Sequence, residues 1–360
     1  MRAIRILLAG GVLLALSTVA RAQTITWDSL NQEVLSLTLK RDFSVALPKA
    51  REALMLAEKR YGPNHLRTAQ SLNNLGFIHL NLNQVPQSET LLTRAVKIFS
   101  NNPNADRTDY VQALNSLARI CAVQHRFARA ETLYTRALGV SQRPPITDSL
   151  QWSQSLNNLA GLYAQQDKFS AAESLCRLSL TIRERTGGPQ SPAALQTLDN
   201  LIYLCARQEK YAAAESLTQR AANLLGRFKS LYPLETANYQ NSQGTFCHLQ
   251  GKFAQAETLF LNVLALREKN LGPDDPAVVK TLDNLAEARK SQKKYEGLDS
   301  LYERMTAAME RNAGPQDPAL VSKLESISRF YESIKQDEKA KKWAARAERA
   351  RPKVKPNGNQ

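Results

Sequence analysis

The chain repeats itself every 42 residues, and this period constrains the fold more than any other feature. When the sequence is cut at 29, 71, 113, 155, 197, 239, 281 and 323, the second position holds leucine in seven of the eight segments. Gln240 is the only exception. Aromatic residues recur thirteen positions later, and small residues recur three positions beyond those. A fixed period of this length is typical of an array of stacked units.

The pattern of each segment predicts two amphipathic helices. In the segment that begins at residue 155, apolar residues fall at helical spacing on both sides of the polar break at 165–168. Glycine and proline close several units, as in GPDDP (272–276) and GPQDP (314–318), where they end one helix and prevent its continuation. One hairpin cannot bury its apolar face alone, but stacked hairpins can. The sequence therefore predicts an all-α fold, a right-handed superhelical solenoid of about eight helix-turn-helix units over residues 23–350.

The two ends differ from the middle. The first unit has Glu33 and Lys49 at positions where later units have leucine, and the last unit has Asp337 and Lys341 where others have the aromatic residue and a glutamate. Polar terminal units are what a solenoid requires for solubility. The tail at 351–360 has too little apolar content to fold, so we expect it to be disordered.

The repeats resemble the tetratricopeptide repeat, in the 42-residue version found in kinesin light chains and many bacterial proteins. The resemblance is carried by LNNLAGLYAQQDKFSAAESL (156–175), TLDNLIYLCARQEKYAAAESL (197–217) and ALREKNLGPDDPAVVKTLDNLAEA (265–288). It implies a binding scaffold in which the first helix of each unit lines a concave groove. The family's partners vary widely, so the resemblance does not identify a ligand.

Amides recur on the face that the resemblance assigns to the groove. Gln154 and Asn157 lie one helical turn apart, and four other units repeat the pair with one aspartate among the amides. Amide groups both donate and accept hydrogen bonds, which suits the backbone of an extended peptide. Similar asparagine ladders in kinesin light chains hold peptide backbones, as the resemblance implies here. The alternative is that the amides only bond neighbouring helices, and we favour it for the second amide of each unit, Asn74, Asn158, Asn200 and Asn284.

Groove residues that vary between units are candidates for determining which ligand binds. Arg119 and Arg207 can pair with ligand carboxylates, and Phe77 and Tyr203 can seat apolar side chains. The complete set of predicted peptide-binding residues is Gln70, Asn73, Phe77, Gln112, Asn115, Arg119, Gln154, Asn157, Gln196, Asp199, Tyr203, Arg207, Asn238 and Asn241.

The N-terminus has the layout of a secretory signal peptide. Arg2 and Arg5 precede an apolar run, and small residues lead to a cleavage site after Ala22. The run is shorter than the roughly 20 residues that a membrane span needs, so we expect cleavage and a periplasmic or secreted protein without a stable membrane span.

Cleavage would remove three arginines and lower the net charge from +15 to +12. Half of that excess lies after residue 320, where eleven Lys or Arg face five Asp or Glu. A basic surface favours partners with acidic side chains. Export argues against nucleic acid, and nothing in the sequence indicates the oligomeric state.

No motif indicates catalysis. The sequence has no glycine-rich phosphate loop, HExxH, CxxC or GxSxG, so we expect a protein that is not an enzyme and binds no cofactor and no metal.

Cys121, Cys205 and Cys247 share one repeat position typical of the core. Cys176 and Cys205, on consecutive helices, are the one pair that can meet, and buried thiols are the favoured alternative to a disulfide.

The sequence thus predicts an envelope adaptor or assembly factor that binds a peptide or protein segment in its groove. Two alternatives stay open. In the first, the protein is a structural subunit that uses its convex face or its ends in a permanent complex. In the second, the basic helix at 337–350, which contains Trp343, binds an anionic surface.

Overall fold

The computed structural model describes residues 26–102, 105–142, 149–188, 192–226 and 232–352, with the side chains of residues 192, 193 and 226 left aside. The predicted signal peptide, residues 1–22, and the last eight residues of the predicted tail lie outside these ranges. The described residues contain sixteen α-helices and no strand. In this part of the chain the predicted all-α repeat fold is confirmed.

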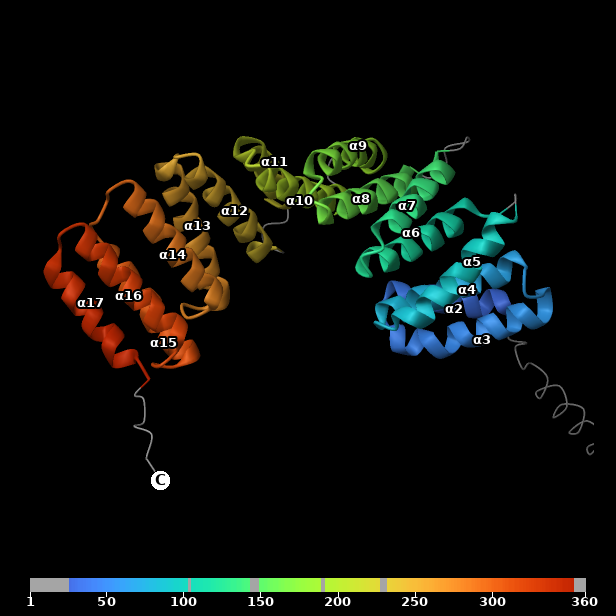
Figure 1. The fold of residues 1–360 in the computed structure, drawn as a ribbon, viewed down its shortest axis with the longest axis horizontal. Helices are drawn as coiled ribbons and strands as arrows, with labels where there is room; N and C mark the ends of the chain where they lie inside the picture. Colours follow the sequence, from blue (N-terminus) through green and yellow to red (C-terminus); the bar gives the residue numbers. More distant parts are fainter. Residues whose placement is uncertain (1–25, 103–104, 143–148, 189–191, 227–231, 353–360) are drawn as a thin grey trace, which may run out of the picture. The chain divides into compact units, whose positions relative to one another are not determined.

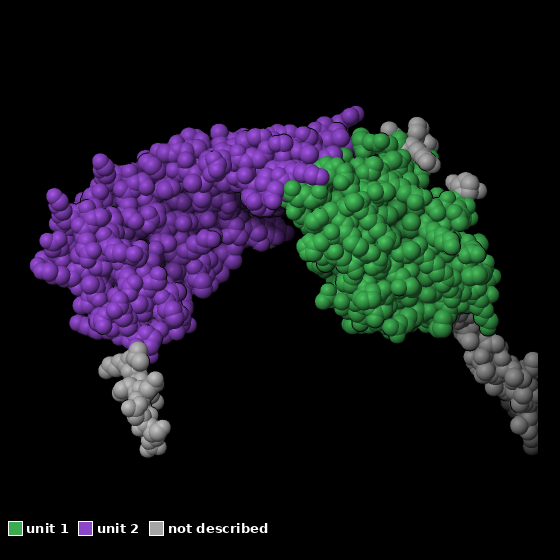
Figure 2. Space-filling model, in the orientation of Figure 1, with its two compact units in different colours: residues 1–166 green, residues 167–360 purple. Residues whose placement is uncertain are grey.

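The helices follow one another as antiparallel hairpins (Figure 1). They divide into two compact units, Met1–Gln166 and Asp167–Gln360, which Figure 2 colours separately. Unit 1 holds α2 (Trp27–Leu39), α3 (Phe43–Tyr61), α4 (Leu66–Asn81), α5 (Val85–Ser100), α6 (Arg107–Val123), α7 (Phe127–Ser141) and α8 (Ser149–Gln165). Unit 2 holds α9 (Phe169–Gly187), α10 (Pro192–Arg207), α11 (Tyr211–Gly226), α12 (Pro233–Leu249), α13 (Phe253–Leu271), α14 (Pro276–Ser291), α15 (Leu298–Ala313), α16 (Pro318–Ser333) and α17 (Asp337–Ala350).

The recurring residues take the places that the sequence predicts for them. The repeated leucine is buried in all seven segments that have it, from Leu30 to Leu324. The small residues at 46, 88, 130, 172, 214 and 256 are fully buried, which lets the two helices of a hairpin approach closely. The aromatic position is the first residue of the second helix in most hairpins, as Phe43, Phe127 and Phe253 illustrate. Glycines with positive φ follow α13 and α15, and prolines begin α14 and α16.

Every described hairpin turn contains a residue in the left-handed region at the same repeat position. Seven of these residues are not glycine, among them Arg41 (φ 63°), His125 (φ 56°) and Glu209 (φ 58°), and Gly251 (φ 76°) is the exception. Side chains other than glycine adopt this conformation at a cost, so where the two helices lie in the same unit their packing maintains the turn. Composition alone does not show this feature, because the position has no common residue type.

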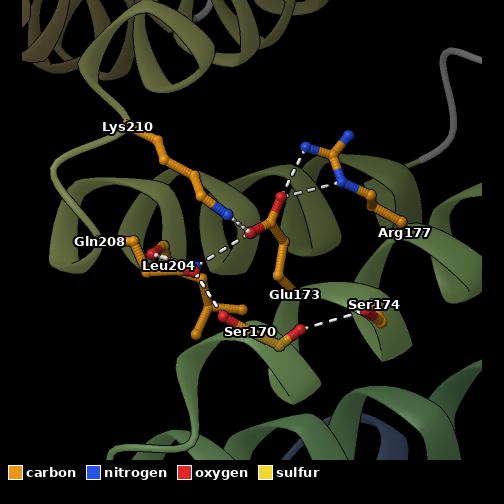
Figure 3. A network of polar contacts seen from close by, with 7 residues as sticks. All are labelled: Ser170, Glu173, Ser174, Arg177, Leu204, Gln208 and Lys210. Atoms are coloured by element: carbon orange, nitrogen blue, oxygen red, sulfur yellow. Dashed lines mark hydrogen bonds and ion pairs between the residues drawn. The ribbon is translucent and has the colours of Figure 1, made fainter.

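A recurring glutamate joins consecutive repeats. In unit 2, Glu173 on α9 accepts hydrogen bonds from Lys210 Nζ (2.8 Å) and Gln208 Nε2 (2.9 Å), which follow α10, and from Arg177 Nη2 (2.7 Å) (Figure 3). Glu215 and Glu257 make the same joint with a glutamine and a lysine from the next repeat. In unit 1, Glu89 accepts from Arg126 Nη2 (2.7 Å) and Gln124 Nε2 (3.3 Å). The recurrence of glutamate in the sequence therefore has a structural reason.

The last helix covers the end of the hydrophobic core of unit 2. Trp343 is fully buried, and its ring packs edge-on against Tyr302 at 6.1 Å between centroids. Asp337 and Lys341, which replace the recurring aromatic residue and the recurring glutamate, are exposed. Because the Trp343 ring is buried in the core, the alternative in which α17 binds an anionic surface rests on the exposed basic side chains of this helix.

Candidate functional site

The first helices of four consecutive repeats line a cleft in unit 1. The cleft has a volume of about 530 Å³, which is within the range typical of ligand sites. Its lining comes from α2, α4, α6 and α8 and consists of Leu35, Thr38, Leu39, Asn73, Asn74, Phe77, Gln112, Asn115, Ser116, Arg119, Gln151, Gln154 and Asn158. Six of the predicted peptide-binding residues meet here. The groove-facing positions of these four repeats therefore lie on one surface.

Asn73 and Asn115 form the polar part of the cleft. Their side chains are buried, with 3% and 9% of their surfaces exposed. Asn115 donates from Nδ2 to Ser155 Oγ at 3.0 Å, which links α6 to α8. Neither Asn73 Oδ1 nor Asn115 Oδ1 accepts a hydrogen bond from any described residue. A buried acceptor without a donor is costly, so both atoms favour a ligand that supplies N–H or O–H groups.

The part of the cleft formed by α2 and α4 is apolar. Leu35 and Leu39 expose 45% and 85% of their surfaces, and Phe77 lies edge-on to Phe43 with 6.3 Å between ring centroids. Sequence reasoning treated the first repeat as a terminal cap and missed both leucines. The signal was present, because Leu35 occupies the repeat position of Phe77 and Arg119.

The cationic group of the cleft is Arg119 on α6. Its side chain is exposed, and it makes no ion pair with the described acidic residues. Gln112, one helical turn from Asn115 on the same face, is exposed as well. The cleft therefore combines apolar surface, unsatisfied acceptors and an available positive charge.

Two predicted residues of unit 1 serve other contacts. Gln70 donates from Nε2 to Asp109 Oδ2 at 2.5 Å, which joins α4 to α6 outside the cleft lining. Burial raises the pKa of Asp109, although this hydrogen bond opposes the change. Asn157 is buried with 5% of its surface exposed and does not line the cleft. Gln154 does line it, and donates to Asn158 Oδ1 at 3.0 Å.

The predicted residues of unit 2 are largely engaged within that unit. Asp199 accepts a hydrogen bond from the Tyr239 hydroxyl at 2.5 Å, and Asn241 accepts from Asn284 at 3.1 Å. Arg207 donates to the Tyr203 hydroxyl at 2.9 Å and pairs with Asp167 at 3.4 Å. These contacts tie neighbouring helices together at positions where the sequence predicts ligand contacts.

Gln196 and Asn238 each accept a hydrogen bond from an arginine of a second helix. Gln196 Oε1 accepts from Arg183 at 3.4 Å, and Asn238 Oδ1 accepts from Arg267 at 2.8 Å. Sequence reasoning assigned no role to either arginine. Their identical repeat position, 84 residues apart, is the signal that pointed to them.

The preferred interpretation of the second amide is confirmed at two positions. Asn74 donates to Asn31 Oδ1 at 2.8 Å, and Asn284 donates to Asn241 Oδ1, each across two consecutive first helices. Asn158 differs, because it accepts from Gln154 of its own helix. The amides thus serve both the packing of repeats and the lining of the cleft.

The four cysteines are buried free thiols, as the favoured interpretation predicts. Burial raises the pKa of Cys176 to about 12, so its thiolate is scarce at neutral pH.

Within the described ranges, no three His, Cys, Asp or Glu side chains are grouped so that they could hold a metal ion. None of the described helices is both long and apolar enough to cross a membrane.

A model of the tetratricopeptide repeat family matches residues 68–143, 153–226 and 235–297, which is more than half of the chain. A search of curated proteins found no match. Several solved structures share the fold at low sequence identity. BtubC (BKLC) from P. vanneervenii is 20% identical, with a TM-score of 0.51 over 63% of this chain and 91% of its own.

Two further structures extend the comparison. A Rap protein complexed with Competence and Sporulation Factor is 15% identical, with a TM-score of 0.52 over 81% of this chain and 78% of its own. A signal transduction ATPase with a tetratricopeptide repeat sensor from Pyrococcus horikoshii reaches a TM-score of 0.64 at 12% identity, over 88% of this chain and 44% of its own. At these identities the likeness concerns the fold alone.

Proposed function

Because the chain belongs to the tetratricopeptide repeat family, whose fold is typical of protein–protein interaction scaffolds, we propose that it is a non-enzymatic adaptor that holds an extended segment of a partner protein in the cleft of unit 1. We place it in the periplasm or outside the cell, as an adaptor or assembly factor of a bacterial envelope. The predicted signal peptide supports this placement.

One observation carries the proposal. Asn73 Oδ1 and Asn115 Oδ1 are buried in the cleft on consecutive first helices, and both lack a donor. An extended backbone presents N–H groups at regular intervals, so it can satisfy both amide oxygens once the two side chains turn toward the cleft. Helices pack roughly 8–10 Å apart and an extended chain rises about 3.3 Å per residue, so each repeat serves about three ligand residues.

The other residues of the cleft determine which side chains of the bound segment fit. The apolar part of the cleft, formed by Leu35, Leu39 and Phe77, can bind a bulky apolar residue of the segment. Arg119 supplies a charge for an acidic one, which agrees with the basic character of the chain. A Rap protein with this fold has been solved with Competence and Sporulation Factor, which supports ligand binding by such an array.

Site-specific photo-crosslinking in cells tests the proposal. A benzoylphenylalanine residue replaces Leu39 in the cleft or, as a matched control, Val45 on α3, which is also exposed but does not line the cleft. We expect a discrete adduct with a partner from position 39 and none from position 45. Adducts from position 45 alone would favour the structural subunit that uses its outer face.

A matched pair of glutamines then tests the chemistry. Gln112 lies in the cleft and Gln87 lies on α5 outside it, and both side chains are exposed. A synthetic peptide spanning the crosslinked segment should bind about fivefold more weakly to Gln112→Ala or Arg119→Ala than to the unchanged protein. It should bind Gln87→Ala with unchanged affinity. Equal affinity for all three variants would remove the cleft from the mechanism.

A further inference from the structure

An ion pair recurs between the second helices of consecutive repeats, and it is separate from the glutamate joint described above. Its glutamate lies in the last turn of one second helix, and its arginine lies 36 residues further on, in the second helix of the next repeat. We call this contact the second-helix pair. The four pairs are Glu58–Arg94 at 2.6 Å, Glu184–Arg220, Glu268–Arg304 and Glu310–Arg346 at 3.9 Å.

Arg136 on α7 is the only one of the five arginines at this repeat position whose partner position lacks glutamate. Ser100, the last residue of α5, stands there instead. The Arg136 side chain is exposed and forms no ion pair with any described acidic residue. The remaining two pairs of positions hold no charged residue at all, namely Gln142 with Leu178 and Gly226 with Asn262. Elsewhere the two charges are present or absent together, so Arg136 is a cation that has kept its place without its partner.

A cleft of about 380 Å³ lies at this incomplete second-helix pair. Ser100 and Arg136 both line it, and its apolar walls are formed by Phe99, Tyr110 and Val140. The Phe99 and Tyr110 rings are buried and pack together with 5.9 Å between their centroids. The guanidinium of Arg136 lies 5.5 Å from the centroid of the Tyr110 ring, which holds it at the cleft. We call this site the α5–α7 cleft.

The charged residues that line the α5–α7 cleft are both arginines, Arg107 and Arg136. Two aspartates of the same region do not line it. Asp106 accepts hydrogen bonds from two backbone N–H groups as the N-cap of α6, and Asp109 accepts one from a glutamine of α4 at 2.5 Å. Neither carboxylate forms an ion pair with Arg136. The cleft therefore presents positive charge beside an apolar wall, a combination that favours an anionic group on an apolar stem.

We propose that the α5–α7 cleft binds a glutamate side chain of a partner protein. Its carboxylate pairs with Arg136, as the glutamates of the other second-helix pairs do with their arginines, and its methylene groups pack on the apolar wall. A glutamate of a polypeptide is the group that four other pairs of repeats use at this place. The inference stands apart from the proposed function, because this cleft shares no lining residue with the cleft formed by α2, α4, α6 and α8.

A double-mutant cycle tests whether position 100 faces Arg136. Ser100→Glu supplies the carboxylate from within the chain, and Ser100→Gln is its neutral counterpart of the same size. Relative to Ser100→Gln, the thermal midpoint of Ser100→Glu should be higher when Arg136 is present than when Arg136→Ala is added. This coupling should shrink as salt is raised. If the midpoint difference is the same with and without Arg136, the inference is wrong.

Selection from a random peptide library displayed on phage tests binding by a partner. The library is selected on the purified protein in the presence of excess soluble Ser100→Glu protein. This competitor keeps the groove intact but occupies the α5–α7 cleft with its own carboxylate, so it removes sequences that bind elsewhere. We expect the remaining sequences to share a glutamate. The inference is overturned if no sequence survives the competitor, which would leave the cleft to free small anions at most, or if the survivors share no acidic residue.

Fluorescence anisotropy of a selected peptide then locates its binding. Replacing the shared glutamate by glutamine in the peptide, or introducing Arg136→Ala or Ser100→Glu in the protein, should weaken binding about tenfold. Ser100→Gln should weaken it less than Ser100→Glu. Arg51→Ala removes an exposed arginine of α3 that also pairs with no described carboxylate, and Arg119→Ala removes the cation of the groove; both should leave affinity unchanged. Equal losses in Arg51→Ala and Arg136→Ala would show general attraction to a basic protein and refute the site.

Discussion

At the scale of single residues, two glycines within helices differ in how crowded their surroundings are. A Cβ atom added to Gly76 on α4 would lie 2.7 Å from Leu92 Cγ, whereas one added to Gly161 on α8 would meet nothing within 4 Å. Leu92 is fully buried and has no room to move. Gly76 thus allows α4 and α5 to approach closely. Gly161 has no such packing role, because the space beside it is open.

The two alanine substitutions should therefore change stability in opposite directions. Gly161→Ala should stabilise the protein by about 0.5–1 kcal/mol, because alanine is the better helix former. Gly76→Ala should destabilise it by about 1–3 kcal/mol through overpacking. The midpoints of thermal unfolding, followed by circular dichroism, give both signs. A loss of stability in Gly161→Ala would contradict the open environment of that position.

At the scale of elements, the glutamate joint between repeats depends on pH. Burial alone would raise the pKa of Glu173, but hydrogen bonds from Lys210, Arg177 and Gln208 outweigh it and lower the pKa to about 2. A carboxyl group with a depressed pKa stabilises the fold above its unfolded-state pKa, and this contribution is lost as the pH falls toward the folded-state value. The joint should weaken between about pH 4.5 and pH 2.

Glu173→Gln should reveal this contribution. At pH 7 we expect a loss of about 1–2 kcal/mol, less than the pKa change alone implies, because the Lys210 and Arg177 side chains are about half exposed and screened by water. The difference from the unchanged protein should shrink as the pH falls from about 4.5 toward 2. Urea unfolding at several pH values measures it. Glu296→Gln, at an exposed glutamate, serves as the control and should show no such trend.

The helices and their ends follow from the sequence because each is determined within one repeat. Apolar spacing, the aromatic residue at the start of the second helix and the glycine-proline ends are local signals, and the structure confirms them. The lining of the cleft was predictable in part, since Phe77, Asn115 and Arg119 follow from alignment of the repeats. The hydrogen-bond partners of Asn115 and Asn238 were not predictable, because they come from other helices: Asn115 bonds to Ser155, 40 residues away, and Asn238 bonds to Arg267, 29 residues away.

At the scale of the whole molecule, all four cysteines are placed in the hydrophobic interior. Ellman's reagent should therefore react with none of them in the native protein. After denaturation without a reductant it should detect four thiols per chain. Burial raises the pKa of Cys176 to about 12 and that of Cys247 to about 11, which slows their reaction further. Detection of only two thiols would show a disulfide, with Cys176 and Cys205 as the pair to test by peptide mapping.

The glutamate joint also bears on how such a gene changes. Glu215 and Glu257 each take their glutamine and lysine partners from the same positions of the following repeat. Unequal recombination that adds or deletes one whole repeat would therefore leave a complete joint on both sides of the change. Because Glu173, Glu215 and Glu257 share the glutamine and lysine partners while the groove residues of their repeats differ, a lineage can lengthen or shorten this part of the protein without redesigning its interfaces, and can alter ligand preference one repeat at a time.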